Sequence, residues 1–203
     1  MHKREFMAAL GAGTLTSGAL ANGALAARDR SGLNGPALLT VTGAIGRGNR
    51  GPLDKALDQM MVKQQLVFDR AHVFDFEALR ALPNITIRPT LEYDAKPHTL
   101  RGPLLGHVLE AAGARLDNTL RLLLRAIDGY TVTLTLAQAR RYRFIIATHL
   151  DGQPMPLGGL GPLWAMYNAD QHADMMARPL PERYAHCPWG LYHLEVQATQ
   201  AVG

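Results

Sequence analysis

Few residues of this sequence could do chemistry by themselves, and they lie far apart along the chain. Cys187 is the single cysteine, which excludes a disulfide within the chain and a cysteine-rich zinc or iron–sulfur site. Asp170, His172 and Asp174 form an acidic cluster that could hold a divalent cation or be a solvated loop. The other histidines lack the spacing of metal ligands. No nucleophile elbow, zinc-protease motif or phosphate loop occurs.

The composition is that of one ordinary globular domain. The chain has 203 residues, of which 47% are hydrophobic and 19% are charged, and its formal net charge is +4. This length is enough to bury a core without disulfides. The lysines and arginines are scattered rather than gathered into a stripe, so charge gives no reason to expect a nucleic-acid partner.

The first 26 residues have the pattern of an export signal peptide. The basic residues Lys3 and Arg4 precede a glycine-rich, weakly apolar stretch, and Ala-Leu-Ala at residues 24–26 fits a cleavage site. A basic pair followed closely by Phe6 is typical of a twin-arginine signal, here with lysine as the first basic residue; the general secretory route stays open. The glycines argue against a membrane anchor. We therefore expect a periplasmic or otherwise exported protein.

The rest of the chain predicts a short linker, residues 27–36, and one domain, residues 37–198. Alternating and periodic apolar residues indicate many short strands with small helices between them. This pattern favours an α+β fold. The expected strands include residues 37–45, 120–127, 130–134, 144–148, a central strand from 85–87 and a closing strand at 193–196, and the expected helices are residues 53–67, 76–82, 104–112 and 136–143.

Several short segments carry a further indication through their order along the chain. They are residues 41–45, 74–83, 99–105, 128–130, 151–156, 161–164 and 189–196. Together they resemble the molybdopterin-binding domain of the sulfite-oxidase family over roughly residues 38–196. The resemblance implies the fold of that domain, with mixed sheets and short helices.

The resemblance also exposes a missing residue. In active members of the family, a cysteine thiolate upstream of the turn that contains Gly102 binds molybdenum, a metal that suits soft thiolate ligands. Counting back from Gly102 places this position at Thr90, whose hydroxyl is a hard ligand and stays protonated near neutral pH. Cys187 lies nearly a hundred residues later, and we expect it to be inert core rather than the metal ligand. Direct binding of molybdenum is therefore not expected, whereas molybdopterin stays a candidate cofactor.

The resemblance further implies residues that hold the pterin and its phosphate. Arginine suits phosphate because its planar guanidinium group donates two parallel hydrogen bonds to the phosphate oxygens. For Asp128 the alternative is a turn-initiating residue, and for Tyr130 a core aromatic residue with its hydroxyl satisfied. The candidates by position are Arg88, His98, Arg101, Asp128, Tyr130 and Arg183, with His186 beside them.

Two principal functions follow. The first is an exported domain that keeps the fold without direct molybdenum ligation. It would bind a small molecule, a pterin, or a periplasmic or membrane protein, as a sensor or accessory protein. The alternative is an active molybdopterin-dependent oxidoreductase that acts on a small periplasmic substrate. A purely structural interaction domain is a third reading, and fold alone does not decide among them.

Overall fold

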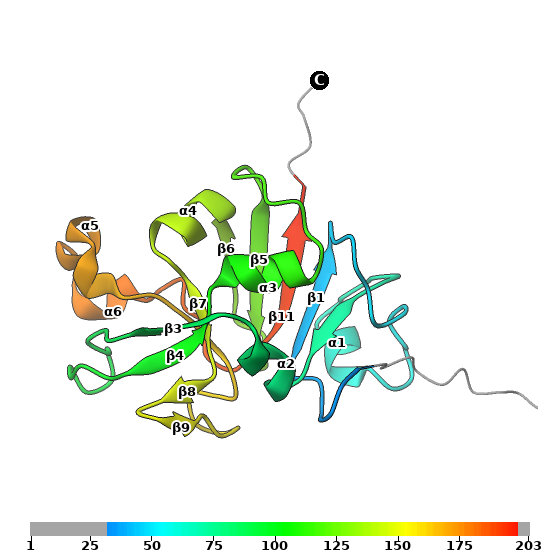
Figure 1. The fold of residues 1–203 in the computed structure, drawn as a ribbon, viewed down its shortest axis with the longest axis horizontal. Coiled ribbons are helices and arrows are strands. Elements are labelled where there is room, and N and C mark those ends of the chain that lie inside the picture. The colour runs from blue at the N-terminus through cyan, green and yellow to red at the C-terminus, as the bar shows by residue number, and fades with distance from the viewer. Residues whose placement is uncertain (1–31, 199–203) are drawn as a thin grey trace, which may run out of the picture.

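The computed structural model describes residues 32–198. The expected signal peptide, residues 1–26, and the first half of the expected linker, residues 27–31, lie outside the described residues. Within the described part, no helix is long and apolar enough to cross a membrane. The chain forms mixed sheets with short helices, as the sequence predicts (Figure 1).

The larger sheet has five strands in the order β2-β1-β11-β5-β6. β1 runs parallel to β11, and the other neighbours are antiparallel. β11 is the last strand along the chain, as the sequence predicts, and it lies in the middle of the sheet, where strands flank it on both sides and most of its residues are buried. The strands are β1 (Leu39–Gly43), β2 (His72–Phe74), β5 (Arg121–Ala126), β6 (Thr131–Thr135) and β11 (Leu191–Gln197).

A second sheet has the order β3-β4-β8-β9, and all its neighbours are antiparallel. A tight turn at residues 151–152 joins β8 to β9, and both of its residues have positive φ, as two-residue hairpin turns require. The expectation of a central strand at 85–87 is wrong, because β3 is an edge strand and has no buried residue. The strands are β3 (Asn84–Ile87), β4 (Leu100–Pro103), β8 (His149–Leu150) and β9 (Gln153–Pro154).

The helices begin and end largely where local residues dictate. Asp75 caps α2 (Phe76–Ala81), since its carboxylate accepts the N–H of Ala78 at 2.7 Å. Gly113, with φ of +77°, ends the turn after α3 (Leu105–Ala111). The remaining short helices are α4 (Leu136–Arg141), α5 (Ala173–Met176), α6 (Leu180–Arg183) and a 3₁₀ turn, η1 (Ala169–Gln171).

The long helix expected at residues 53–67 is wrong. Only α1 (Gln59–Lys63) forms there. The Asp54 carboxylate accepts the N–H of Leu57 and so holds a turn before α1, and Gln65 leaves helical geometry with φ of +59°. Leu57 is 67% exposed, so the apolar stripe is only partly core.

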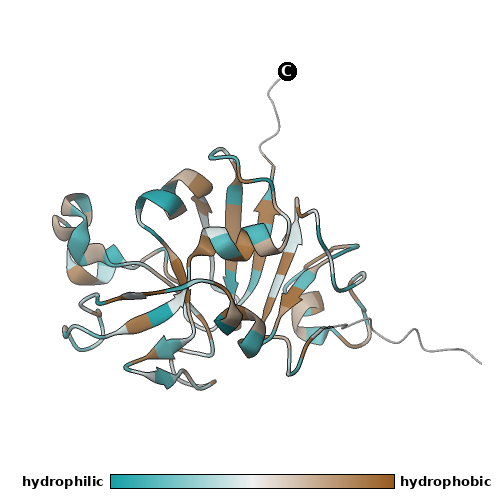
Figure 2. Cartoon of the chain, viewed as in Figure 1, coloured by the Kyte–Doolittle hydropathy of each residue, from teal (hydrophilic) through white to brown (hydrophobic). Residues whose placement is uncertain are grey.

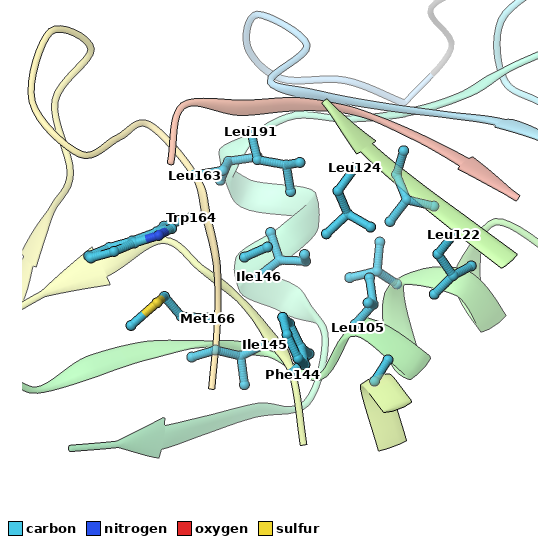
Figure 3. Close-up of a cluster of buried hydrophobic side chains, with 14 of the residues drawn as sticks. Leu105, Leu122, Leu124, Phe144, Ile145, Ile146, Leu163, Trp164, Met166 and Leu191 are labelled. Atoms are coloured by element: carbon cyan, nitrogen blue, oxygen red, sulfur yellow. The ribbon is translucent and has the colours of Figure 1, made fainter. Parts of the chain in front are cut away.

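The main core lies where α3, the five-stranded sheet and the ribbon of β7 (Ile145–Ala147) and β10 (Trp164–Met166) meet. Hydrophobic residues concentrate on these strands (Figure 2). Trp164 lies at one side of the packed cluster, beside Met166, and both are buried (Figure 3). Buried residues labelled in that view include Leu105, Leu122, Leu124, Ile145, Ile146, Leu163 and Leu191.

Candidate functional site

A pocket of about 360 Å³ brings together three segments that are far apart in the sequence. They are residues 92–93, the turn between β5 and β6, and the stretch from 181 to 189. This volume lies at the lower end of the range of small-molecule sites. Of the residues predicted from the sequence, Asp128, Tyr130 and Cys187 line the pocket.

The side chains around the pocket are rich in aromatic rings. Tyr93, Tyr130, Tyr184 and Trp189 all contribute to the lining. Tyr93 and Tyr130 are 56% and 50% exposed. The Tyr130 hydroxyl donates to the carbonyl of Ala185 at 2.7 Å, which joins the β5–β6 turn to the 181–189 stretch. Tyr130 is thus an exposed pocket residue rather than the core aromatic residue of the alternative interpretation.

The base of the pocket rests on the core. The indole N–H of Trp164 donates to the carbonyl of Cys187 at 2.8 Å, and the rings of Trp164 and Tyr93 lie 6.2 Å apart. Cys187 is only 5% exposed. Burial, assisted by the negative charge of Glu92, raises the pKa of the Cys187 thiol well above its ordinary value. The thiol therefore stays protonated, so it offers no thiolate at neutral pH.

Two carboxylates give the pocket a negative character. Glu92 is half-buried and Asp128 is exposed, and Asp128 also accepts the N–H of Tyr130 at 2.9 Å, as a turn-initiating residue does. Burial and the neighbouring Glu92 raise the pKa of Tyr93 to about 12, which leaves its hydroxyl as a donor. In residues 32–198, no basic side chain lines this pocket, and none forms an ion pair with either carboxylate.

Thr90, the position implied for the metal ligand, lies beside the pocket but does not line it. Its N–H donates to the Asp170 carboxylate at 2.8 Å, and its carbonyl accepts the hydroxyl of Tyr184 at 2.9 Å. Thr90 therefore ties the segment after β3 to η1 and to the end of α6. Its backbone has a structural role in this region.

The predicted cations on the first half of the chain do not gather at the pocket. Arg88 and Arg101 are exposed. His98 lies between two carboxylates, with its ring nitrogens 3.0 Å from Asp94 and 2.6 Å from Asp151. The hydrogen bonds to Asp151 and then Asp94 raise the pKa of His98, and the same bonds lower the pKa of both carboxyl groups. We name this arrangement the His98 clamp.

Arg183 faces the other side of the 181–189 stretch. Its guanidinium donates to the carbonyls of Arg178 and Met176 at 3.0 and 3.3 Å, and it lies 3.7 Å from the Asp170 carboxylate. With His186 it lines a separate cavity of only about 90 Å³. These bonds commit Arg183 to the connection between α5 and α6.

The acidic cluster noted in the sequence does not converge on a common point. The carboxylate of Asp170 accepts from Thr90, whereas that of Asp174 accepts from the Tyr142 hydroxyl at 2.6 Å and from Arg141. Among residues 32–198, no group of three or more histidine, cysteine or acidic side chains is arranged to hold a metal ion. The segment is not a loop either, because Asp170 lies in η1 and Asp174 lies in α5.

Several pocket residues were not singled out from the sequence, namely Glu92, Tyr93 and Tyr184. Glu92 and Tyr93 directly follow Thr90 and Leu91, and nothing in their local pattern separates them from an ordinary polar turn. Trp189 was used only as part of a matching segment. The tyrosines and tryptophan that lie in these loop segments were the one signal in the sequence that could have pointed to the pocket.

The fold is similar to one of known structure. The crystal structure of the sulfane dehydrogenase SoxCD from Paracoccus pantotrophus matches with a TM-score of 0.51 and 11% sequence identity. The match covers 78% of this chain and 37% of the other, so the chain spans little more than a third of that protein's length. No protein-family model matches the chain, and no curated protein matches it in sequence. At this level of identity the likeness is one of fold.

Proposed function

We propose that this chain is an exported sulfite-oxidase-like domain that binds a small molecule without direct molybdenum ligation, as a sensor or accessory protein. The order of its sequence segments and its fold similarity to a sulfane dehydrogenase support the assignment to this kind of domain. One observation carries the proposed role, which is that the candidate site offers no thiolate. Periplasmic location and a periplasmic or membrane protein partner belong to the proposal through the sequence pattern at residues 1–26.

The residues present do not fit the molybdenum centre that such a domain implies. Thr90 offers a protonated hydroxyl where a soft ligand is needed, and its backbone is occupied by Asp170 and Tyr184. Cys187 is the only sulfur nucleophile in the chain, and burial keeps its thiol protonated. We therefore derive no chemical step through a bound metal.

The charges at the pocket also do not suit the phosphate of a pterin cofactor. Anionic groups bind where arginines or backbone N–H groups converge. Here His98 is held in its clamp, Arg183 is occupied by carbonyls, and the pocket presents Glu92 and Asp128 instead. A ligand other than molybdopterin fits this pocket better.

An active molybdopterin-dependent oxidoreductase is the second candidate. The observation in its favour is the fold shared with a sulfane dehydrogenase. This candidate requires Cys187 to bind the metal as a thiolate, because no other cysteine exists. The two functions therefore differ in a measurable property, the molybdenum content of the native protein.

The test is elemental analysis combined with pterin fluorescence on the full chain, purified after native export. We expect no stoichiometric molybdenum in the natural protein or in the Cys187→Ser variant. Thr90→Cys serves as the matched variant at the implied ligand position, and we expect no metal there either, since the pocket is acidic. Stoichiometric molybdenum in the natural protein that is lost in Cys187→Ser would establish the oxidoreductase instead.

A further inference from the structure

We infer that the pocket formed by residues 92–93, 126–130 and 181–189 takes a small organic cation, such as a quaternary ammonium compound or an amine. This inference deepens the proposed function, because it names the class of ligand that the binding domain takes. It rests on three features of the pocket: its charge, its aromatic lining and its size.

The charge of the pocket is negative although the chain as a whole carries +4. Glu92 and Asp128 enter from separate segments and face the same space. Across the described residues, neither has a lysine, arginine or histidine within ion-pair distance. Two carboxylates of one sign beside a cavity attract a positively charged ligand and repel an anion.

The aromatic lining suits the same class of ligand. Trp189, Tyr93 and Tyr130 surround the pocket together with the two carboxylates. The electron-rich faces of tryptophan and tyrosine attract cations, and recognition of quaternary ammonium groups by such residues is a common use of this interaction. An aromatic wall also favours a weakly hydrated organic cation over a metal ion, which needs several converging oxygen ligands.

The pocket has one open carboxylate oxygen and two fixed aromatic rings. Asp128 uses one oxygen for the N–H of Tyr130, which leaves its second oxygen without a hydrogen bond to the described residues. The hydroxyls of Tyr130 and Tyr184 are bonded to backbone carbonyls, so these two rings are fixed in place before a ligand arrives. Such fixed walls lower the cost of ordering the site on binding.

The size of the pocket limits the ligand. A volume of about 360 Å³ admits a compact molecule and excludes a dinucleotide or a long peptide. Choline is a suitable probe because it combines a quaternary ammonium group with a short polar arm. Its neutral isostere, 3,3-dimethylbutan-1-ol, has the same shape with carbon in place of nitrogen, so the pair isolates the effect of charge.

The experiment titrates choline, the isostere and inorganic phosphate into the full natural chain by calorimetry. Tryptophan fluorescence is recorded in parallel, since Trp189 lines the pocket and Trp164 lies beneath it. We expect choline to bind more tightly than the isostere and phosphate not to bind. Equal binding of choline and its isostere, or preferential binding of phosphate, would overturn the inference.

Matched variants locate the binding. Glu92→Gln removes one charge and keeps the shape, and Asp128→Asn keeps the acceptor for Tyr130. Each should weaken choline binding by about two- to fivefold, and the double variant by more. Asp117→Asn is the control, because Asp117 accepts an N–H in a similar exposed turn outside the pocket. Loss of choline affinity in the control, or unchanged affinity in the double variant, would contradict this location.

The outcomes also separate this inference from the proposed function. Molybdenum in the natural protein would remove the proposed function whatever the choline titration shows. A metal-free protein that does not distinguish choline from its isostere would leave a binding domain whose ligand is not a cation.

Discussion

Two pairs of carboxylates in this fold have different environments. Asp94 and Asp151 hold His98 between them, and Asp151 also accepts the N–H of Thr99 at 2.8 Å. Glu92, only two residues before Asp94, instead faces the pocket together with Asp128. The first pair has a basic partner, whereas the second faces a cavity and has no ion-pair partner among residues 32–198.

The difference teaches how to tell a structural charge from a functional one. A carboxylate bonded to a histidine and to backbone N–H groups stabilises the fold, and its pKa falls accordingly. A carboxylate that faces a cavity without a basic partner can instead attract a cationic ligand. The comparison predicts that changes at the clamp alter stability, whereas changes at the pocket alter ligand affinity.

The largest expected effect comes from removing the base of the pocket. Trp164→Ala deletes a side chain that is 1% exposed and that donates to the Cys187 carbonyl, so it should lower the free energy of unfolding by about 4 kcal/mol. Denaturant unfolding measures this loss. Trp189→Ala is the matched control, since Trp189 is only partly buried and should cost less. Equal losses in the two variants would show that the base and the wall of the pocket are energetically alike.

A smaller loss is expected at the clamp. Asp151→Ala removes the bonds to His98 and Thr99 in an exposed turn, and it should cost about 1 kcal/mol in the same unfolding measurement. The left-handed backbone of Asp151, with φ of +48°, adds a penalty for alanine that asparagine largely avoids. Asp151→Asn should therefore be milder. No difference between the natural chain and Asp151→Ala would show that the clamp is only a surface pair.

The clamp also predicts a pH dependence. The pKa of His98 is raised in the folded state above 6.5, so its contribution to stability is fully present below pH 6.5 and is lost as the pH rises through the raised pKa. The pKa values of Asp94 and Asp151 are lowered from 3.8, so their contribution is present above that pH and lost as the pH falls through the lowered values.

Melting temperatures of the natural chain and of His98→Gln, recorded from pH 5 to 9, test this dependence. The natural chain should lose more stability than the variant between pH 6.5 and the upper end of the range. Parallel curves for the two proteins would contradict the raised pKa of His98.

Much of the fold could be predicted from the sequence because local rules act strongly there. Asp75 caps the start of α2, and Gly113 ends α3 in the left-handed conformation. Alternation of apolar and polar residues predicts the strands β5 and β6. Where local rules are weak, the expectations were wrong. The stripe at 53–67 matched a helix in spacing, yet the Asp54 side chain held a competing turn.

The candidate site was only partly accessible to sequence analysis. Asp128, Tyr130 and Cys187 were chosen, and they line the pocket. The arginines were chosen because they suit phosphate, but the folded chain commits Arg183 to carbonyls that no sequence pattern reveals. Whether a charge is paired depends on contacts between distant segments, such as that between residues 98 and 151. Type and spacing therefore identify candidate charges, and only the fold shows which ones are free.

The smallest expected effect on stability gives the sharpest test of the comparison. Glu92→Gln removes a carboxylate that has no ion-pair partner among residues 32–198, so the free energy of unfolding should change by less than about 0.5 kcal/mol. Chemical denaturation of Glu92→Gln and Asp151→Ala in the same buffer compares the change in the free energy of unfolding at the two carboxylate pairs. A loss at Glu92→Gln as large as that at Asp151→Ala would mean that Glu92 stabilises the fold, and it would contradict the distinction between the two carboxylate pairs. A small change in the free energy of unfolding together with weakened choline binding would instead show that Glu92 acts in ligand binding, whereas Asp151 acts in stability.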